Sequence, residues 1–385
     1  MIGVQIHMVS KIKQLSLGVL LALSATAAQA EIRFNGFASI QAGSTLSSSD
    51  SLYGYNNEVD FKNESLFALQ AQADLGDRLS VTAQLMGRGA NDFNAEFEWA
   101  YLTYELNSQT RINAGRLRTP FYRYSDFMDV GYAYDWARVP SSVYNLDFNN
   151  LEGVSLVRFG QLGEVDSTLQ LILGSYSGTT AITPAPADAT IERIAGATWE
   201  LVQGDFSARL AYLTGKLTLV DQDGELSGLL NLLEQSGFAS TASQIRIDDA
   251  SSAFMGLALG YDNGSLVLSG EVVRARVKDT VIPTQNGYYL SAGYRIDSYT
   301  PFVSFERRDN DGKAEIYQAL AAENLFRPAV TTVVESFTTK RDTWNIGSRY
   351  DFHPSAALKV QFSSQKDKVA DRRDQLLTVG IDLVF

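Results

Sequence analysis

The feature that most constrains this fold is an alternation of apolar and polar residues with a period of two, which recurs along most of the chain. Around residue 350, Trp344, Ile346 and Phe352 fall on one face of an extended segment. Asn345 and Arg349 fall on the other face. This pattern predicts half-buried β-strands. A soluble β-sandwich alternates in the same way, so the fold class depends on how the strands are connected.

The connections between the predicted strands are alternately short and long. We predict sixteen strands, at residues 31–43, 64–75, 79–89, 95–106, 109–117, 152–160, 166–176, 190–203, 205–217, 251–262, 265–277, 286–297, 300–309, 340–352, 355–366 and 374–385. The even-numbered connections are tight turns, whereas most odd-numbered ones are long, at residues 44–63, 118–151, 177–189, 218–250 and 310–339. This asymmetry is typical of a transmembrane barrel with periplasmic turns and extracellular loops. We therefore predict an all-β, sixteen-stranded antiparallel barrel with both termini in the periplasm.

The first thirty residues have the three parts of a secretory signal peptide. Lys11 and Lys13 form a basic start, residues 15–25 are apolar, and Ala28-Gln29-Ala30 is an A-x-A cleavage site. The apolar run is too short to span a membrane comfortably. We expect cleavage before Glu31, which leaves residues 31–385 as one barrel domain.

Composition argues against several function classes. The chain carries a net charge of -12, which does not suit nucleic-acid binding. It has no Cys and two His, and His7 lies in the predicted signal peptide. We therefore predict no catalytic residue, no metal site and no cofactor. A hydrolase built on carboxylates alone remains the enzymatic alternative.

The long connection at 118–151 is the region in which a functional site is expected. Seven aromatic residues from Phe121 to Trp136 argue against disorder. In a barrel too wide to be filled by its own side chains, such a loop can fold inward and narrow the pore. The ionisable residues of this predicted constriction loop are Arg118, Arg123, Asp126, Asp129, Asp135, Arg138 and Asp147.

Basic residues on the polar faces of the strands are candidates for the opposite pore wall. They are Arg33, Arg88, Arg116, Arg158, Arg209, Arg295, Arg349 and Lys359, although the alternation around Arg116 and Arg158 is ambiguous. Opposed acidic and basic groups would set a field across the lumen and bias ion selectivity. The alternative is that these cations pair with acids of the strands and keep the lumen hydrated, the candidates being Asp74, Glu200, Glu271, Asp297, Asp351 and Asp382.

Two of the long loops contain possible short helices. Leu226, Leu229, Leu230 and Leu233 have helical spacing, and residues 317–325 form a second candidate. Such helices can cap a long loop, gate the mouth of a channel or contact a neighbouring subunit.

Two stretches resemble a known family. GRLRTPFYRYSDF, which begins at Gly115, is similar to the fifth strand and constriction loop of marine proteobacterial porins, and LLTVGIDLVF ends the chain on an aromatic residue, Phe385. The chain thus resembles the general Gram-negative porins. That resemblance implies a homotrimeric outer-membrane channel for passive diffusion of ions and small hydrophilic solutes. It also implies contact with outer-membrane lipid and lipopolysaccharide, and a role for Phe385 as the signal read by the outer-membrane assembly machinery. A substrate-specific channel and a non-conducting structural barrel are the alternatives.

Overall fold

The computed structural model describes residues 31–180 and 186–385. The predicted signal peptide, residues 1–30, lies outside the described residues. Sixteen antiparallel strands form one closed barrel in which each strand pairs with its sequence neighbours, and β1 pairs with β16. The strands are β1 (Ile32–Thr45), β2 (Leu66–Gly76), β3 (Leu79–Arg88), β4 (Ala95–Asn107), β5 (Thr110–Arg118), β6 (Asn150–Leu162), β7 (Val165–Thr180), β8 (Ala187–Gln203), β9 (Phe206–Asp221), β10 (Ala250–Asp262), β11 (Leu266–Val277), β12 (Gln285–Tyr294), β13 (Tyr299–Asn310), β14 (Thr339–His353), β15 (Ala356–Asp367) and β16 (Arg372–Val384). The predicted sixteen-stranded barrel is confirmed.

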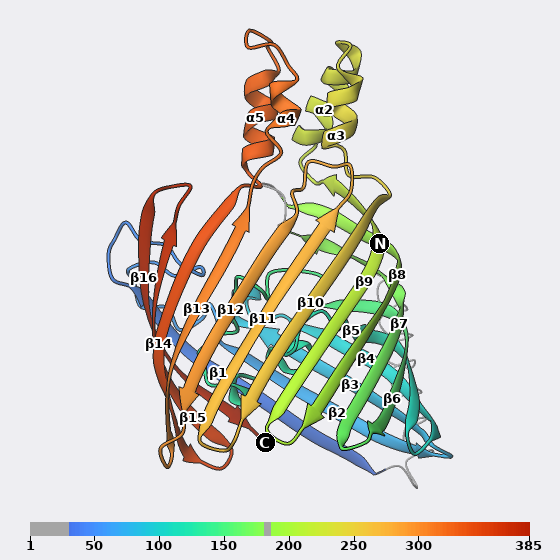
Figure 1. The fold of residues 1–385 in the computed structure, drawn as a ribbon, viewed down its shortest axis with the longest axis vertical. Helices are drawn as coiled ribbons and strands as arrows, with labels where there is room; N and C mark the ends of the chain where they lie inside the picture. Colours follow the sequence, from blue (N-terminus) through green and yellow to red (C-terminus); the bar gives the residue numbers. More distant parts are fainter. Residues whose placement is uncertain (1–30, 181–185) are drawn as a thin grey trace, which may run out of the picture.

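The two ends of the barrel differ as the connection lengths predicted. Tight turns close one end and the long loops emerge at the other (Figure 1). The first turn uses Asp77 and Arg78 with positive φ of 50° and 67°, the conformation that favours a two-residue hairpin. One boundary was wrong: the expected loop 177–189 is shorter, because β7 continues to Thr180 and β8 begins at Ala187.

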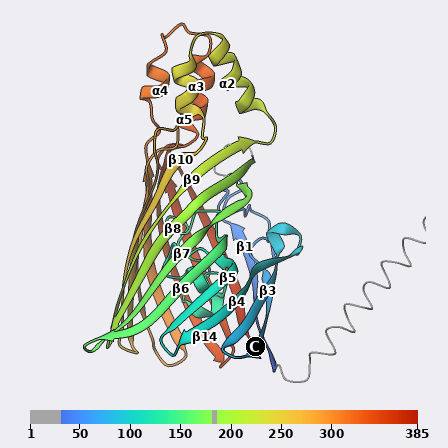
Figure 2. The ribbon, with the colours of Figure 1, turned by 90° about the vertical axis from the view of Figure 1, so that its right-hand side faces the viewer.

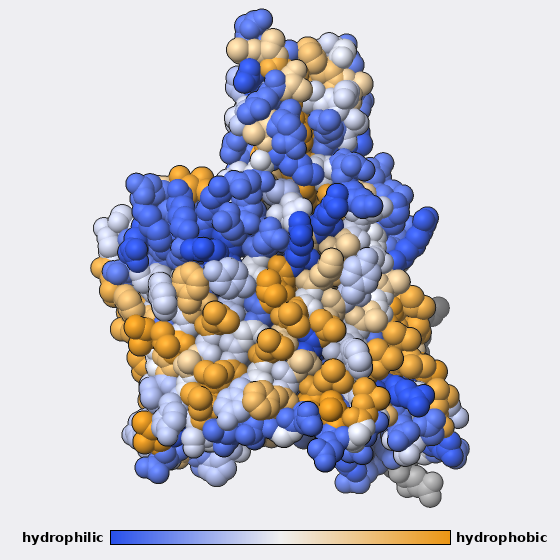
Figure 3. All heavy atoms as spheres, in the orientation of Figure 1, coloured by the Kyte–Doolittle hydropathy of each residue, from blue (hydrophilic) through white to orange (hydrophobic). Residues whose placement is uncertain are grey.

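The barrel is polar inside and apolar outside at membrane height. On β16, Leu377 and Val379 are exposed on the outer face. Thr378 and Asp382, on the opposite face, are buried. Trp344 and Ile346 of β14 are likewise exposed. Figure 3 shows apolar residues in a belt around the middle of the molecule, with hydrophilic side chains above and below it. This arrangement buries the apolar face in lipid and hydrates the polar face from the lumen.

Chain closure places the last residue beside the first strand. The backbone N–H of Gly36 donates to the Phe385 carbonyl (2.8 Å), and the Phe385 N–H donates to the Gly36 carbonyl (3.0 Å). The Phe385 ring stacks on Phe67 with centroids 5.8 Å apart. A Cβ on Gly36 would lie 2.3 Å from the Phe385 ring, so this close approach requires glycine.

Four short helices rise above the extracellular rim and form what we call the extracellular helix cluster (Figures 1 and 2). They are α2 (Glu225–Gln235), α3 (Ala239–Ile245), α4 (Glu315–Gln318) and α5 (Arg327–Glu335). The leucine spacing correctly predicted α2. The helix expected at 317–325 was misplaced, because α4 ends at Gln318 and α5 begins at Arg327, with Pro328 in its first turn. Among the described residues, no helix is long and apolar enough to cross a membrane.

Candidate functional site

Residues 119–149, between β5 and β6, form what we call the internal loop. It lies inside the barrel (Figure 1) and includes two short 3-10 turns, η2 (Ser125–Phe127) and η3 (Gly131–Ala133). Trp136 Nε1 donates to Ser291 Oγ of β12 (2.9 Å), and the Ala137 N–H donates to Gln361 Oε1 of β15 (2.9 Å). Gln41 of β1 donates to the Ala137 carbonyl (2.8 Å). The predicted inward fold of this loop is therefore confirmed.

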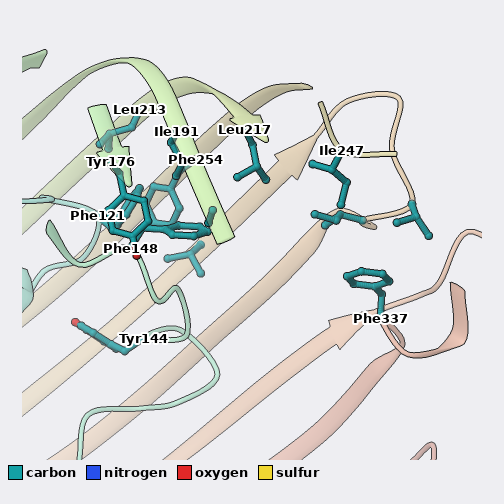
Figure 4. Close-up of a cluster of buried hydrophobic side chains, with 14 of the residues drawn as sticks. Phe121, Tyr144, Phe148, Tyr176, Ile191, Leu213, Leu217, Ile247, Phe254 and Phe337 are labelled. Atoms are coloured by element: carbon teal, nitrogen blue, oxygen red, sulfur yellow. The ribbon is translucent and has the colours of Figure 1, made fainter. Parts of the chain in front are cut away.

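Aromatic residues of the internal loop pack against the wall formed by β7–β10. Phe121 contacts Phe254 of β10 with centroids 4.8 Å apart, and Phe148 contacts Tyr176 of β7 at 5.3 Å. Figure 4 shows these rings gathered beside Ile191. A small apolar cavity of about 70 Å³ remains between loop and wall. One side of the lumen is consequently filled by hydrophobic packing.

An ion-pair cluster fixes the loop to the wall of β3–β5. Asp129 of the loop accepts hydrogen bonds from Arg118 (2.7 Å) and Arg88 (3.1 Å). Glu98 of β4 pairs with the same two arginines at 2.8 Å and 2.9 Å. Arg118 also stacks over the Trp99 ring at 5.2 Å. Asp129 was expected to face a basic wall across the lumen, but it contacts two arginines directly, so its charge is neutralised locally.

A fully buried lysine fixes the next part of the loop. Lys359 of β15 and Asp382 of β16 each expose 1% of their side chains and pair at 2.9 Å. Lys359 Nζ also donates to the carbonyls of Gly131 (2.5 Å) and Trp136 (2.7 Å). A Cβ on Gly131 would lie 2.1 Å from Asp382 Oδ1, so the loop backbone passes against the wall here without a side chain. The lysine therefore satisfies a carboxylate and two loop carbonyls together.

Arg138 connects the internal loop to the extracellular loop 46–65. Its guanidinium forms a two-bond pair with the Glu64 carboxylate, with both N–O distances 2.7 Å. It also donates to Thr378 Oγ1 (2.7 Å) and stacks over the Tyr53 ring at 4.6 Å. Arg138 is thus another anchor of the loop, and its charge is already paired.

Two buried wall carboxylates hold the loop backbone. Glu271 of β11 accepts from the Arg123 N–H (3.0 Å) and from the Tyr144 hydroxyl (2.8 Å). Glu306 of β13 accepts from the Ser142 N–H (3.0 Å). Sequence reasoning treated Glu271 as a general hydrating group and missed Glu64, Glu98 and Glu306. The alternation along β13 could have indicated Glu306, because Phe305 faces outward and its neighbour Glu306 therefore faces the lumen.

An open polar cavity of about 290 Å³ lies between the loop and the wall of β9–β14. Its lining includes Arg123 and Asp135 from the loop and Arg295 and Arg349 from the wall. Arg295 forms two bonds to Asp262 (2.5 and 2.8 Å). Asp135 has no ion pair or hydrogen bond within the part of the chain that the structure describes. The cavity therefore combines paired arginines with one carboxylate free to interact with solutes.

Most of the remaining predicted residues lie apart from this cavity, but Arg349 belongs to its lining. Asp126 is exposed, and Asp147 accepts from Thr180 Oγ1 at 2.9 Å. Arg209 faces inward and donates to the Pro120 carbonyl (2.8 Å). Arg349 bonds to the carbonyls of Tyr132 and Tyr134, and to Asp351. Arg33 lies at the periplasmic end, 69% exposed and 3.8 Å from Glu31, well away from the loop.

The prediction that Arg116 and Arg158 line the pore wall is wrong. Arg116 lies opposite Glu152 of β6 and pairs with it at 2.6 Å. Glu152 shares its face with exposed Val154, so both charges lie on the outer surface of the barrel. Arg158 is exposed on that same face. Near the internal loop, inward Leu117 and Leu151 are apolar because they pack under it, which hides the usual polarity difference between the faces.

No group of three or more metal-ligating side chains occurs in residues 31–180 and 186–385. His353 ends β14 beside a tight turn, where its Nδ1 accepts from the Ser355 N–H (3.1 Å). The next residue, Pro354, accepts a hydrogen bond from the Tyr132 hydroxyl of the internal loop (2.8 Å). The polar groups brought together in the lumen can bind and orient solutes and water, as a channel requires.

Comparison with known proteins identifies the family. The model of the Gram-negative porin family matches residues 17–382. The outer-membrane channel DcaP of Acinetobacter baumannii is 12% identical, with coverage of 93% of this chain and 98% of that chain and a TM-score of 0.60. An anion-selective porin from Comamonas acidovorans is 13% identical, with coverage of 93% and 100% and a TM-score of 0.56. A trimer form of Vibrio cholerae OmpT is 9% identical, with coverage of 92% and 99% and a TM-score of 0.54.

At these identities the solved structures show a shared fold, and no curated protein sequence matches the chain. The family match covers nearly the whole chain, including β1–β15 and all but the last two residues of β16. The closed barrel, its apolar belt and the loop inside its lumen agree with that match. The chain belongs to the Gram-negative porins and forms a bacterial outer-membrane channel for passive diffusion of small solutes.

Proposed function

We propose that the internal loop sets the narrowest part of the pore and that solutes pass through the polar cavity beside it. The observation that carries this proposal is that many wall strands bind the loop. Gln41 of β1 bonds to it, and so does Thr378 of β16. With one side of the lumen filled by aromatic packing, the cavity of about 290 Å³ is a polar space beside the loop. A narrow path of this kind favours ions and small hydrophilic solutes.

The charges around the cavity favour weak ion selectivity. Arg295 and Arg349 are each paired with an aspartate, which cancels much of their field. Arg123 donates to Ser207 and Asp135 has no ionic partner among the described residues, so one cation and one anion remain exposed to passing solutes. Opposed single charges orient dipolar solutes more than they exclude either sign of ion. A field across the lumen is thus proposed for Asp135 and Arg123, and not for Asp129.

Planar-bilayer recording of the refolded mature protein tests this proposal. We expect stepwise openings and a reversal potential close to zero under a salt gradient. Asp135→Asn should shift the reversal potential toward anion preference, whereas Asp126→Asn, which removes the same charge from the same loop outside the cavity, should leave it nearly unchanged. A folded barrel that gives no conductance would favour the non-conducting alternative. Saturable block by one solute would favour a substrate-specific channel.

We also propose a homotrimer. The Arg116–Glu152 pair lies on the outer face of β5 and β6. In an isolated subunit this face would contact lipid, which solvates charged groups poorly. A neighbouring subunit over this face would cover it, and the similar Vibrio cholerae OmpT structure is described as a trimer. A single cysteine placed at Arg116 should crosslink neighbouring subunits in outer-membrane vesicles treated with a bifunctional thiol reagent. Monomers in detergent and in vesicles would contradict the trimer.

Phe385 is proposed as the assembly signal, as the family resemblance implies. Its ring also packs on Phe67 and over Gly36, so a loss of folding alone would not separate the two roles. Phe385→Ser should therefore be compared in cells and in detergent refolding. A variant that refolds in detergent but fails to reach the outer membrane would support recognition by the assembly machinery. Equal loss in both would support packing alone.

Two further expectations belong to the proposal. Residues 1–30 should be absent from the mature protein, and its mass should begin at Glu31. The channel should also carry out no catalysis. Incubation with peptide and ester substrates checks this, and turnover that is lost on substituting a lumen carboxylate would contradict it.

A further inference from the structure

The apolar cavity of about 70 Å³ between the internal loop and the barrel wall is lined from both sides. Phe121 and Phe148 come from the loop, and Figure 4 shows them beside the wall residues Leu213 and Phe254. Leu213, Phe254 and Ala275 are successive register partners on β9, β10 and β11, so they form one row across the inner face. The cavity is therefore a space inside the barrel and not a groove on its lipid-facing surface.

The size of this cavity suits one end of a small ligand. A dry cavity of about 150 Å³ accommodates benzene, so about 70 Å³ leaves room for a short alkyl group. Among the lining residues that face inward, Ser252 and Gln285 carry polar side chains. Ser252 already donates to the Gly215 carbonyl (3.0 Å). Gln285 thus marks the polar side of the cavity.

Gln285 joins the cavity to an arginine of the lumen. It continues the row across the inner face, because it is the register partner of Ala275. Its Oε1 accepts from Arg308 Nη2 of β13 (3.2 Å). The Nε of Arg308 is buried without a hydrogen-bond acceptor, and residues 31–180 and 186–385 provide this guanidinium with no ion pair. A cation with spare donors therefore lies beside the apolar cavity.

The arginines next to Arg308 are paired with carboxylates. Arg341 of β14, its register partner, pairs with Asp367 of β15 at 3.1 Å. Arg307 precedes it on the outer face and forms two bonds to Asp342, both 2.7 Å. Arg308 differs from both in having no carboxylate at ion-pair distance within the part of the chain that the structure describes.

The cavity and Arg308 are accessible from the extracellular mouth. Glu306 of β13 holds the loop backbone at Ser142, and Arg308 lies two residues further toward the extracellular end of this strand. Gln285 is the first residue of β12 at the same end. A solute that enters from outside therefore reaches this site before it passes the internal loop.

We propose that the apolar cavity and Arg308 bind a monocarboxylate that carries a short branched alkyl group. The alkyl group fills the cavity, while the carboxylate accepts from the Arg308 guanidinium and from Gln285 Nε2, which donates to no group among the described residues. Neighbouring strands are about 4.8 Å apart, so a carboxylate attached directly to such an alkyl group can reach from the row of Gln285 to Arg308. An inorganic anion leaves the cavity empty and a hydrocarbon leaves the arginine unpaired, so the site selects amphipathic anions.

This inference goes beyond the proposed function. It requires access from the extracellular mouth but no conduction past the internal loop. Binding to the folded protein in detergent and conductance in a bilayer can therefore fail independently. A barrel that conducts normally but does not bind the carboxylate would refute this inference alone.

The test is a titration of the folded mature porin in detergent with isovalerate, followed by ligand-observed NMR. Saturable binding is expected. Acetate lacks the branched alkyl group and isovaleramide lacks the charge, so each should bind at least about tenfold more weakly. Acetate binding as tightly as isovalerate would show a simple anion site, and isovaleramide binding as tightly would show apolar binding alone. Either result would overturn the proposal.

Variants locate the binding in the structure. Arg308→Gln should weaken isovalerate binding at least about tenfold. Arg307→Gln removes the same charge from the adjacent outward residue and should stay within about twofold of the parent. Ala275→Leu should fill the cavity and abolish binding, whereas Ala292→Leu adds the same side chain between exposed Leu290 and Tyr294 of β12 and should have no effect.

All four variants should keep the heat-dependent gel shift of a folded barrel. Parental affinity in Arg308→Gln would overturn the role of the cation, and parental affinity in folded Ala275→Leu would overturn the role of the cavity. If Ala275→Leu fails to fold, Arg308→Gln and the acetate comparison still decide the question.

Discussion

The internal loop and the extracellular helix cluster are both long insertions between strands, but the internal loop is anchored to the barrel wall, by aromatic packing and by polar contacts, whereas the helix cluster packs mainly on itself. The internal loop is held by charged and polar contacts with many wall strands, such as Lys359 and Glu271. The helix cluster is held by apolar contacts among its own helices, where Leu233 and Val330 are completely buried. Phe238 of one hairpin meets Phe326 of the other with centroids 5.9 Å apart.

The difference follows from what surrounds each insertion. Along β14 and β15 the inward positions are polar, so a loop backbone that loses water finds donors and acceptors there. Above the rim no wall exists, and short helices must bury their apolar faces against one another. The comparison indicates that the loop and the barrel should unfold together, whereas the helix cluster should unfold separately.

The largest expected effect is that of Lys359→Met. The substitution leaves the buried Asp382 without its cation and removes the donor from two loop carbonyls, which should destabilise the barrel by about 3–5 kcal/mol. Release of the loop at Gly131 should also raise single-channel conductance. Urea unfolding and bilayer recording measure the two effects. The double variant Lys359→Met/Asp382→Leu should recover much of the stability, and failure to do so would argue against the ion pair as the cause.

Asp129→Ala should have the next largest effect. It leaves Arg88 and Arg118 with Glu98 alone, and the loss of two charge-assisted hydrogen bonds should cost about 2–3 kcal/mol. The loop should become mobile near η2 and conductance should become noisy. Urea unfolding and bilayer recording measure these effects. Asp126→Ala, at an exposed residue of the same loop, is the control. Equal behaviour of the two variants would contradict the anchoring role of Asp129.

Leu233→Ala tests the other side of the comparison. The cavity left among α2–α5 should cost about 2 kcal/mol, but the loss should be confined to the helix cluster. Hydrogen exchange should quicken in residues 222–249 and 311–338 while the barrel strands and the conductance stay unchanged. If barrel stability fell as well, the helix cluster and the barrel would be one cooperative unit.

Arg246→Ala should have the smallest effect. Arg246 pairs with Glu234 at 2.7 Å, yet both side chains are more than two-fifths exposed, at 43% and 44%. Such a pair contributes about 0–1 kcal/mol and weakens with salt. Hydrogen exchange of α2 at low and high salt measures it. A loss as large as that of Lys359→Met would show that burial does not explain the difference between the two regions.

Part of the candidate site could be predicted from sequence and part could not. Inward orientation of Arg349 and Lys359 follows from alternation, because each strand segment fixes its own faces locally. The partners of Asp129 and Arg138 are set by how a long loop folds through the lumen, and no local pattern records that. Glu64 and Arg138 are 74 residues apart in the chain.

The sequence by itself determined the number of strands, the asymmetry between the two ends of the barrel and the position of the internal loop. These features depend on alternation and turn residues, which act over a few neighbouring positions. The tertiary structure alone decided that Arg116 and Arg158 face outward, since apolar packing under the internal loop reverses the polarity of that wall. It also brought together Lys359 and the Gly131 carbonyl, 228 residues apart, because the closed barrel surrounds the internal loop.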